Sequence, residues 1–215
     1  MAVVCQDCKD SGFTYSEEDG VLSAKQCSCQ IELRTEMLFE ASGIPRKFSG
    51  ATFENFKPES GTMQGQTHAL LKRYTRDFEA GQKGWLLFGP PGTGKTHLAC
   101  ATIRELSRKH GVRCRFVDFF QLLQQLKMAF GEHSGQGSLL RPLLDSDFIV
   151  IDELGSGPNR EWDLGVLDHL ISHRYNNCKT TFFTTNFSPR DKPSSSKKYS
   201  PTRSLSQAMS AGVSL

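Results

Sequence analysis

Apolar residues between positions 85 and 185 fall into short continuous runs that alternate with stretches of helical spacing. The runs predict strands at 85–88, 112–117, 148–151 and 180–185, and the spacing predicts helices at 95–110, 119–130 and 162–176. Strands and helices that alternate in this way form a parallel sheet with helices on both faces. The pattern therefore predicts an α/β fold, in which we interpret the Gly- and Ser-containing stretch 131–138 as a loop.

Weaker patterns on either side of this region indicate how the chain is organised. A helical pattern at 31–39, a short aromatic segment at 51–56 and an amphipathic helix at 67–79 precede the first strand. Beyond residue 189 the sequence is rich in Ser, Lys and Pro and has no convincing apolar period. We therefore divide the chain into a small module at 1–30, a connector at 31–66, a core at 67–189 and a tail at 190–215 that we expect to be disordered.

One motif of the core predicts nucleotide binding. The stretch after strand 85–88 fits G-x-x-x-x-G-K-[ST] and reads Gly89-Pro90-Pro91-Gly92-Thr93-Gly94-Lys95-Thr96. Its glycines let backbone amides face phosphate oxygens at the positive end of the following helix. Lys95 is expected to reach the β- and γ-phosphates and Thr96 to hold Mg²⁺, so this phosphate loop (residues 89–96) predicts binding of ATP with magnesium.

Polar residues that follow two predicted strands complete the candidate site. Asp152 and Glu153 follow strand 148–151, where Asp152 would hold magnesium and Glu153 would orient and deprotonate the attacking water. Asn186 follows strand 180–185, where its amide would contact the γ-phosphate and the water, although Asn is also common where strands end. A water-activating Glu favours ATP hydrolysis over phosphoryl transfer to a small substrate.

The module at 1–30 is too short and too polar to form a core without a cross-link. Cys5 and Cys8 form one pair, and Cys27 and Cys29 form a second pair after eighteen intervening residues. Four thiolates match a tetrahedral zinc site of structural type, while unliganded or redox thiols remain the alternative because C-x-C is less typical than a second C-x-x-C. The remaining cysteines, Cys100, Cys114 and Cys178, are expected to pack in the core.

Composition adds only broad limits to this prediction. The chain has 215 residues with 37% hydrophobic content, which suits one principal globular domain with a small appendage. No apolar run reaches the eighteen or more residues that span a bilayer, and we expect a cytoplasmic protein that does not act at a membrane. The formal net charge of +3 argues neither for nor against nucleic-acid binding.

Taken together, the motifs resemble the DnaC/IstB family of AAA+ ATPases, and most of all helicase loaders of the DnaC and DnaI type. The resemblance covers roughly residues 1–189. Its motifs are the two cysteine pairs, Ser42-Gly43-Ile44-Pro45-Arg46-Lys47-Phe48, Ala51-Thr52-Phe53-Glu54-Asn55-Phe56, the phosphate loop, Ile151-Asp152-Glu153-Leu154-Gly155, Glu161-Trp162, Arg174-Tyr175 and Thr184-Thr185-Asn186-Phe187-Ser188-Pro189.

The resemblance implies a P-loop AAA+ core and an ATPase that binds single-stranded DNA and grips a replicative helicase through the zinc module. It also implies homo-oligomers in which an arginine of one subunit completes the next subunit's site. Arg174 could face a neighbouring subunit's nucleotide or pair with a surface acid. The family's C-terminal lid and trans-acting arginine are not recognisable after Pro189, so the chain carries no assigned arginine of that kind.

Three other functions remain open at the level of the sequence. An IstB-like helper ATPase of transposition shares the predicted fold, but the four-cysteine module favours a loader. A nucleotide-switched adaptor without useful turnover would use zinc for its partner and ATP for its shape. A small-molecule kinase is disfavoured, because it explains neither the zinc module nor the combination of Asp152, Glu153 and Asn186.

Overall fold

A four-stranded parallel sheet forms the centre of the computed structural model, which describes residues 5–18, 20–58, 61–129, 135–155 and 161–187. The strand order is β3-β6-β5-β4, with β3 at Leu86–Phe88, β6 at Thr180–Thr185, β5 at Phe148–Asp152 and β4 at Cys114–Asp118. All three pairings in this sheet are parallel. The carboxyl ends of the strands therefore meet at one edge, where ligands bind in open α/β sheets.

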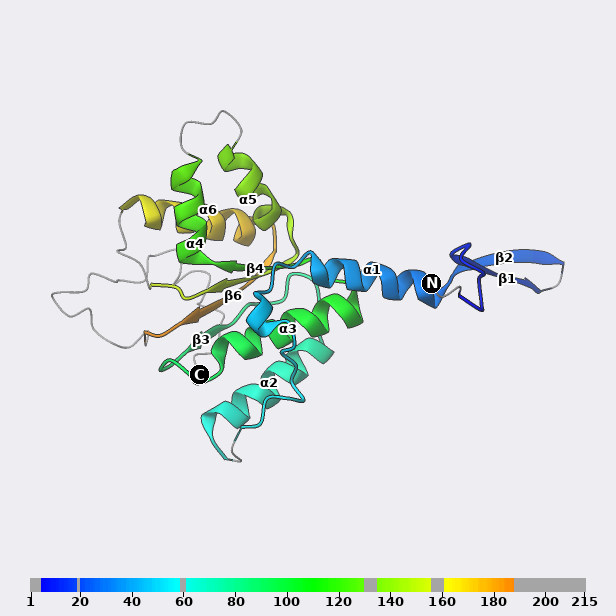
Figure 1. The fold of residues 1–215 in the computed structure, drawn as a ribbon, viewed down its shortest axis with the longest axis horizontal. Coiled ribbons are helices and arrows are strands. Elements are labelled where there is room, and N and C mark those ends of the chain that lie inside the picture. Colours follow the sequence, from blue (N-terminus) through cyan, green and yellow to red (C-terminus); the bar gives the residue numbers. More distant parts are fainter. Residues whose placement is uncertain (1–4, 19, 59–60, 130–134, 156–160, 188–215) are drawn as a thin grey trace.

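Helices cover both faces of this sheet (Figure 1). The helices α2 (Met63–Arg76) and α3 (Lys95–His110) lie on one face, and α4 (Phe119–Met128), α5 (Gly135–Asp145) and α6 (Glu161–Asn176) lie on the other. Each predicted strand and helix between residues 85 and 185 is present, with ends that differ by at most two residues. The predicted α/β class and the sheet flanked by helices are confirmed.

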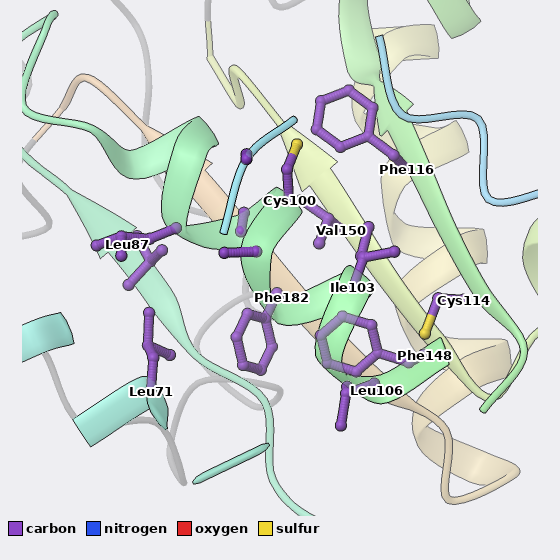
Figure 2. Packing of buried hydrophobic residues seen from close by; sticks show 14 of the residues in the cluster. Leu71, Leu87, Cys100, Ile103, Leu106, Cys114, Phe116, Phe148, Val150 and Phe182 are labelled. Carbon is purple, nitrogen blue, oxygen red and sulfur yellow. The ribbon is translucent and has the colours of Figure 1, made fainter. Parts of the chain in front are cut away.

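Consecutive strand residues feed two separate cores, which explains the continuous apolar runs. Phe148 and Val150 pack with α2 and α3, whereas Ile149 and Ile151 pack with α4, α5 and α6. Figure 2 shows part of the first core, in which Phe182 lies among residues of the sheet and of α3. Neighbouring residues of a strand point to opposite faces, so a strand covered on both sides has no polar alternation.

One helix was missed in the sequence, and the interpretation of 131–138 as a loop is wrong for residues 135–138. The helix α5 begins at Gly135 and continues to Asp145, while residues 131–134 lie outside the described part. Leu139, Leu140, Leu143 and Leu144 of this helix pack in the second core. Its glycines and Pro142, which are poor helix formers, conceal this amphipathic spacing in the sequence.

The N-terminal residues form an arm, by which we mean the described residues 5–40. The arm contains an antiparallel hairpin of β1 (Phe13–Glu18) and β2 (Val21–Gln26), followed by α1 (Ser28–Glu40). The hairpin is missing from the sequence prediction, because polar residues interrupt its strands and every residue of β2 is exposed. Figure 1 shows α1 beside α3 and the hairpin at the outer end of the arm, away from the sheet.

The arm is attached to the core at the end of α3 that lies away from the phosphate loop. The guanidinium carbons of Arg104 and Arg108 lie 4.4 Å and 4.6 Å from the centre of the buried Phe39 ring. The Nη2 atom of Arg108 donates a hydrogen bond to a carboxylate oxygen of Glu36 at 2.7 Å. Cation–π contacts and an ion pair thus connect α1 to the helix that begins with Lys95.

Arg174 is fully buried, so both predicted roles for it are wrong. Its guanidinium donates to the carbonyl oxygens of Leu143, Ser146 and Thr180 at 2.6–2.8 Å, and to Oγ1 of Thr181 at 2.9 Å. Burial lowers the pKa of Arg174 to about 10, which leaves the side chain charged at neutral pH. Arg174 therefore ties α6 to the end of α5 and the start of β6, and reaches neither a neighbour's nucleotide nor a surface acid.

The other structural expectations have mixed outcomes. Cys100 and Cys114 are buried in the first core as predicted, whereas Cys178 is exposed, which contradicts its predicted packing. The tail that we expect to be disordered at 190–215, where we also recognise no lid, lies outside the described residues. Among the helices that the structure describes, none has both the length and the apolar character needed to cross a bilayer.

Candidate functional site

The phosphate loop connects β3 to α3 at the carboxyl edge of the sheet. Gly94 precedes the helix with φ of 89°, in the left-handed region that glycine adopts without strain. The Nζ atom of Lys95 donates to the carbonyl oxygens of Gly89 at 2.9 Å and of Pro90 at 2.8 Å. Desolvation lowers the pKa of Lys95, against the opposing effect of Asp152 and Glu153. The ammonium group thus lies over the loop that would enclose the phosphates.

An aromatic residue of the predicted connector packs directly on this loop. A Cβ atom added to Gly94 would lie 2.3 Å from a ring carbon of Phe56, so the close approach requires a glycine. The ring of Phe56 stacks on His68 of α2 and contacts His97 of α3, with centroid distances of 5.8 Å and 5.3 Å. The ring of His97 forms a hydrogen bond with the carbonyl oxygen of Thr52 at 2.9 Å. Residues 51–56 therefore hold the first turn of α3 in place.

Thr96 and Asp152 meet at the edge between the loop and β5. The Oγ1 atom of Thr96 donates to the carboxylate oxygens of Asp152 at 3.1 Å and 3.3 Å. Adjacent oxygen ligands of an octahedral Mg²⁺ lie about 3.0 Å apart, as follows from metal–oxygen distances of about 2.1 Å. Burial raises the pKa of Asp152, although Thr184 and Thr96 donate to its carboxylate. A hydroxyl and a desolvated carboxylate at this separation suit a small divalent cation.

Glu153 and Asn186 follow β5 and β6 at the same edge of the sheet. Glu153 is exposed and has φ of 56°, an uncommon conformation for a residue other than glycine. Asn186 is also exposed and follows β6, which lies between β3 and β5. Asn186 therefore follows the strand that lies between β3, which precedes the phosphate loop, and β5, which precedes Glu153.

A cavity beside the phosphate loop includes residues that sequence reasoning missed. It has a volume of about 170 Å³ and is mainly apolar, and α2 contributes Met63, Gln64 and Thr67 to its lining. The Nε2 atom of Gln64 donates to the carbonyl oxygen of Thr93 at 3.2 Å. The predicted helix began at residue 67, whereas α2 begins at Met63, because Oγ1 of Thr62 accepts from the amide of Gly65. Recognition of Thr62 as a helix cap would have placed Met63 and Gln64 in this helix.

The four N-terminal cysteines converge although the pairs are far apart in sequence. Their sulfur atoms all lie within 4.8 Å of one another, at 3.8 Å for Cys5 and Cys27 and at 3.5 Å for Cys8 and Cys29. Sulfur ligands of a tetrahedral zinc lie about 3.8 Å apart, as follows from zinc–sulfur distances of about 2.3 Å. The hairpin of β1 and β2 joins the two pairs, since its first register pair is Phe13 with Gln26.

The cysteines of this cluster shift one another's pKa values. Burial opposes the charged form of Cys8, but hydrogen bonds from the Gly12 backbone and from the neighbouring cysteines lower its pKa to about 7. A hydrogen bond with Cys8 and burial raise the pKa of Cys29. A metal cation bound to the four sulfurs would favour their thiolate forms.

Comparisons with known proteins agree with the fold and with ATP binding. The family described as IstB-like ATP binding protein matches residues 3–192. The replicative helicase loader DnaC of Escherichia coli (strain K12) is 27% identical over 157 residues, which cover 72% of this chain and 62% of that protein. The phage-like element PBSX protein XkdC of Bacillus subtilis (strain 168) is 30% identical over 186 residues, which cover 81% of this chain and 68% of that protein. The chain therefore spans less than two thirds of the length of the DnaC relative.

Solved structures show the same architecture. The crystal structure of the DnaC helicase loader has a TM-score of 0.62 at 29% identity, with 78% of this chain and 89% of that chain covered. AMPPCP-bound DnaA from Aquifex aeolicus has a TM-score of 0.63 at 18% identity, with 78% and 49% covered, and shows the fold alone. The AAA+ type of core predicted from the motifs is thus confirmed. The match over residues 3–192 shows that the chain belongs to the family of IstB-like ATP binding proteins.

Proposed function

We propose that the chain is an AAA+ ATPase that acts as a loader of a replicative helicase. The observation that carries this proposal is the meeting of Lys95, Thr96 and Asp152 at one sheet edge, in a family of ATP-binding proteins. The DnaC relatives are described as replicative helicase loaders, which supports the choice of pathway.

Each residue of the site has a proposed task in ATP binding and hydrolysis. The phosphate loop would enclose the phosphates, with Lys95 released from Gly89 and Pro90 to bind them. Thr96 and Asp152 would hold Mg²⁺, which shields phosphate charge when it is bound. Glu153 would orient and deprotonate the attacking water, and Asn186 would contact that water and the γ-phosphate. The mainly apolar cavity lined by Met63 of α2 adjoins the loop, and we assign the base of the nucleotide to it.

The arm is the proposed contact with the helicase. Its cysteine cluster fits zinc by sulfur spacing, so Cys5, Cys8, Cys27 and Cys29 would hold the hairpin on α1. The arm also exposes large apolar side chains, among them Tyr15 and Leu22 of the hairpin and Leu33 and Met37 of α1. Exposed apolar side chains on a projecting element favour contact with another protein. Binding of single-stranded DNA and homo-oligomerisation are further parts of the proposal, which the resemblance of the sequence motifs to helicase loaders implies.

The enzymatic part is tested by comparing the unaltered chain with Glu153→Gln. We expect the variant to bind ATP with unchanged affinity and to lose hydrolysis by at least about a hundredfold, because the carboxylate takes part only in the chemical step. Glu79→Gln serves as the control, since Glu79 is an exposed carboxylate remote from the loop. Equal turnover in the unaltered chain and Glu153→Gln would refute an active ATPase and leave the nucleotide-switched adaptor.

The loading part is tested by pull-down of a purified replicative helicase. We expect the unaltered chain and Cys178→Ser, which changes an exposed cysteine outside the cluster, to retain the helicase, and Cys5→Ser and Cys27→Ser to lose it. Fluorescence anisotropy with labelled single-stranded DNA tests the second partner. Failure of the unaltered chain to retain the helicase would refute the loader function.

A helper ATPase of transposition is the second candidate, because the matching family is described as IstB-like. Such a protein would use the same nucleotide site with a transposase as its partner. Retention of a transposase in place of the helicase in the same pull-down distinguishes the two functions.

A further inference from the structure

Thr184 of β6 contacts three consecutive residues at the end of β5. Its Oγ1 atom donates a hydrogen bond to Oδ1 of Asp152. The Oγ1 atom of Thr184 also accepts a hydrogen bond from the backbone amide of Glu153 at 3.1 Å. Its carbonyl oxygen accepts from the amide of Leu154 at 2.8 Å. Thr184 is 1% exposed, so these bonds have no competition from water. One side chain therefore holds both acidic residues of the proposed site.

The bond to Glu153 acts where the backbone has an unfavourable conformation. Glu153 has φ of 56°, which brings Cβ of an ordinary residue close to its own backbone. Residues in such conformations persist only where surrounding contacts impose them, and they occur often at functional sites. The Thr184 hydroxyl supplies one such contact, because it fixes the amide of Glu153 relative to β6. The direction of the Glu153 side chain thus depends on that hydroxyl.

The hydrogen bond from Thr184 to Asp152 is matched by one from Thr96 on the other side of the carboxylate. Thr96 donates to the carboxylate of Asp152 from α3, and Thr184 donates to it from β6. Two hydroxyls on two elements therefore fix the carboxylate that would hold Mg²⁺. A threonine at this position does what no apolar side chain of equal shape can do.

We propose that Thr184 is a positioning residue of the ATPase site, which sets the orientation of Asp152 for the cation and of Glu153 for the attacking water. This inference rests on the proposed function, since it deepens the roles given there to Asp152 and Glu153. Nothing in the phosphate-loop motif or the acidic pair points to Thr184, because its task arises from the pairing of β5 with β6.

A purely structural role for Thr184 predicts different behaviour in matched variants. Thr184→Val keeps the shape, the β-branch and the backbone bond to Leu154 but removes both side-chain bonds. Thr184→Ser keeps the hydroxyl and removes only a methyl group. Thr180→Val is the control, because Thr180 is a buried threonine of the same strand whose hydroxyl donates to the carbonyl oxygen of Gln82 at 2.7 Å, at the opposite end of β6.

The test uses the full chain and measures ATP hydrolysis, ATP affinity with Mg²⁺ and ATP affinity with a chelator. We expect Thr184→Val to lower kcat by about tenfold to a hundredfold, as misplacement of reacting groups does, with a change in KM below about threefold. It should also reduce the gain in ATP affinity on addition of Mg²⁺. Thr184→Ser and Thr180→Val should keep kcat within about threefold of the unaltered chain.

The measurements distinguish failure of the role of Thr184 from failure of the proposed ATPase function. Thr184→Val with an unchanged kcat, or Thr184→Ser as slow as Thr184→Val, would overturn the positioning role. If the unaltered chain has no turnover, the ATPase proposal fails, and the Mg²⁺-dependent gain in ATP affinity then decides about Thr184. An equal gain in Thr184→Val and the unaltered chain would overturn the inference in that case.

Discussion

Replacement of Arg174 by methionine should destabilise the fold strongly and should not act specifically on ATP hydrolysis. Methionine fills much of the space but leaves the carbonyl oxygens of Leu143, Ser146 and Thr180 without their donor. All three residues are at most 7% exposed. Oγ of Ser146 still donates to the Leu143 oxygen at 3.2 Å, so two acceptors are left without this donor. A buried acceptor without a partner costs about 1–3 kcal/mol, which gives roughly 2–6 kcal/mol for two.

The expected loss lies toward the lower end of that range. The variant also removes a desolvated charge, whose burial is already unfavourable and lowers the pKa of Arg174 to about 10. We therefore expect a decrease of about 2–3 kcal/mol in the free energy of unfolding, a large part of the roughly 5–15 kcal/mol typical of a domain. Arg174→Lys should lose less, because an ammonium keeps the charge but cannot span all the acceptors.

Urea unfolding, followed by circular dichroism and by fluorescence of Trp85 and Trp162, measures this loss. Arg141→Met is the matched control, since Arg141 of α5 is 85% exposed and should change stability by less than about 0.5 kcal/mol. A stability of Arg174→Met within about 1 kcal/mol of the unaltered chain, together with lost ATP hydrolysis, would refute this reasoning. That result would return Arg174 to a role at a neighbouring subunit's nucleotide.

Three further predictions concern the loop, an ion-paired carboxylate and the arm. Gly94→Ala should weaken ATP binding by more than about tenfold in titration calorimetry, because the new Cβ meets Phe56 at 2.3 Å and φ is 89°. Although partial burial opposes ionisation, hydrogen bonds from Arg113 and Lys179 lower the pKa of Asp147. The stabilisation that goes with a lowered pKa is present above the pKa of the unfolded chain and is lost as the pH falls. Asp147→Asn should therefore lower the free energy of unfolding by about 1 kcal/mol at pH 7 and by progressively less toward pH 3. One zinc per chain is expected by elemental analysis, and chelation or Cys27→Ser should expose the arm to trypsin while the core stays protected.

The phosphate loop and the acidic pair were predictable because each is local in sequence. The contact of Thr96 with Asp152 followed from placing both at the carboxyl edge of a parallel sheet, and the structure has it at 3.1 Å. The zinc-like spacing of Cys5, Cys8, Cys27 and Cys29 was likewise predictable from ligand count, although the hairpin between the pairs was not. Short-range patterns carry such features, since a few adjacent residues suffice to form them.

Other features depended on contacts that no local pattern contains. Arg174 lies near the end of a helix, and only the packing of α5 against α6 reveals three carbonyl acceptors around it. Phe56 lies far before the loop in sequence, yet it excludes any side chain at Gly94.

The sequence by itself determined the strand–helix alternation, the nucleotide motif, the acidic pair and the metal-binding set of cysteines. Only the tertiary structure decided that α5 exists, that Arg174 is structural, that α2 lines the cavity beside the loop and that Thr184 holds Asp152 and Glu153. The physical reason is that a buried polar side chain takes its role from whichever groups lack a partner around it. Those groups come from distant segments that are neighbours only once the sheet has formed.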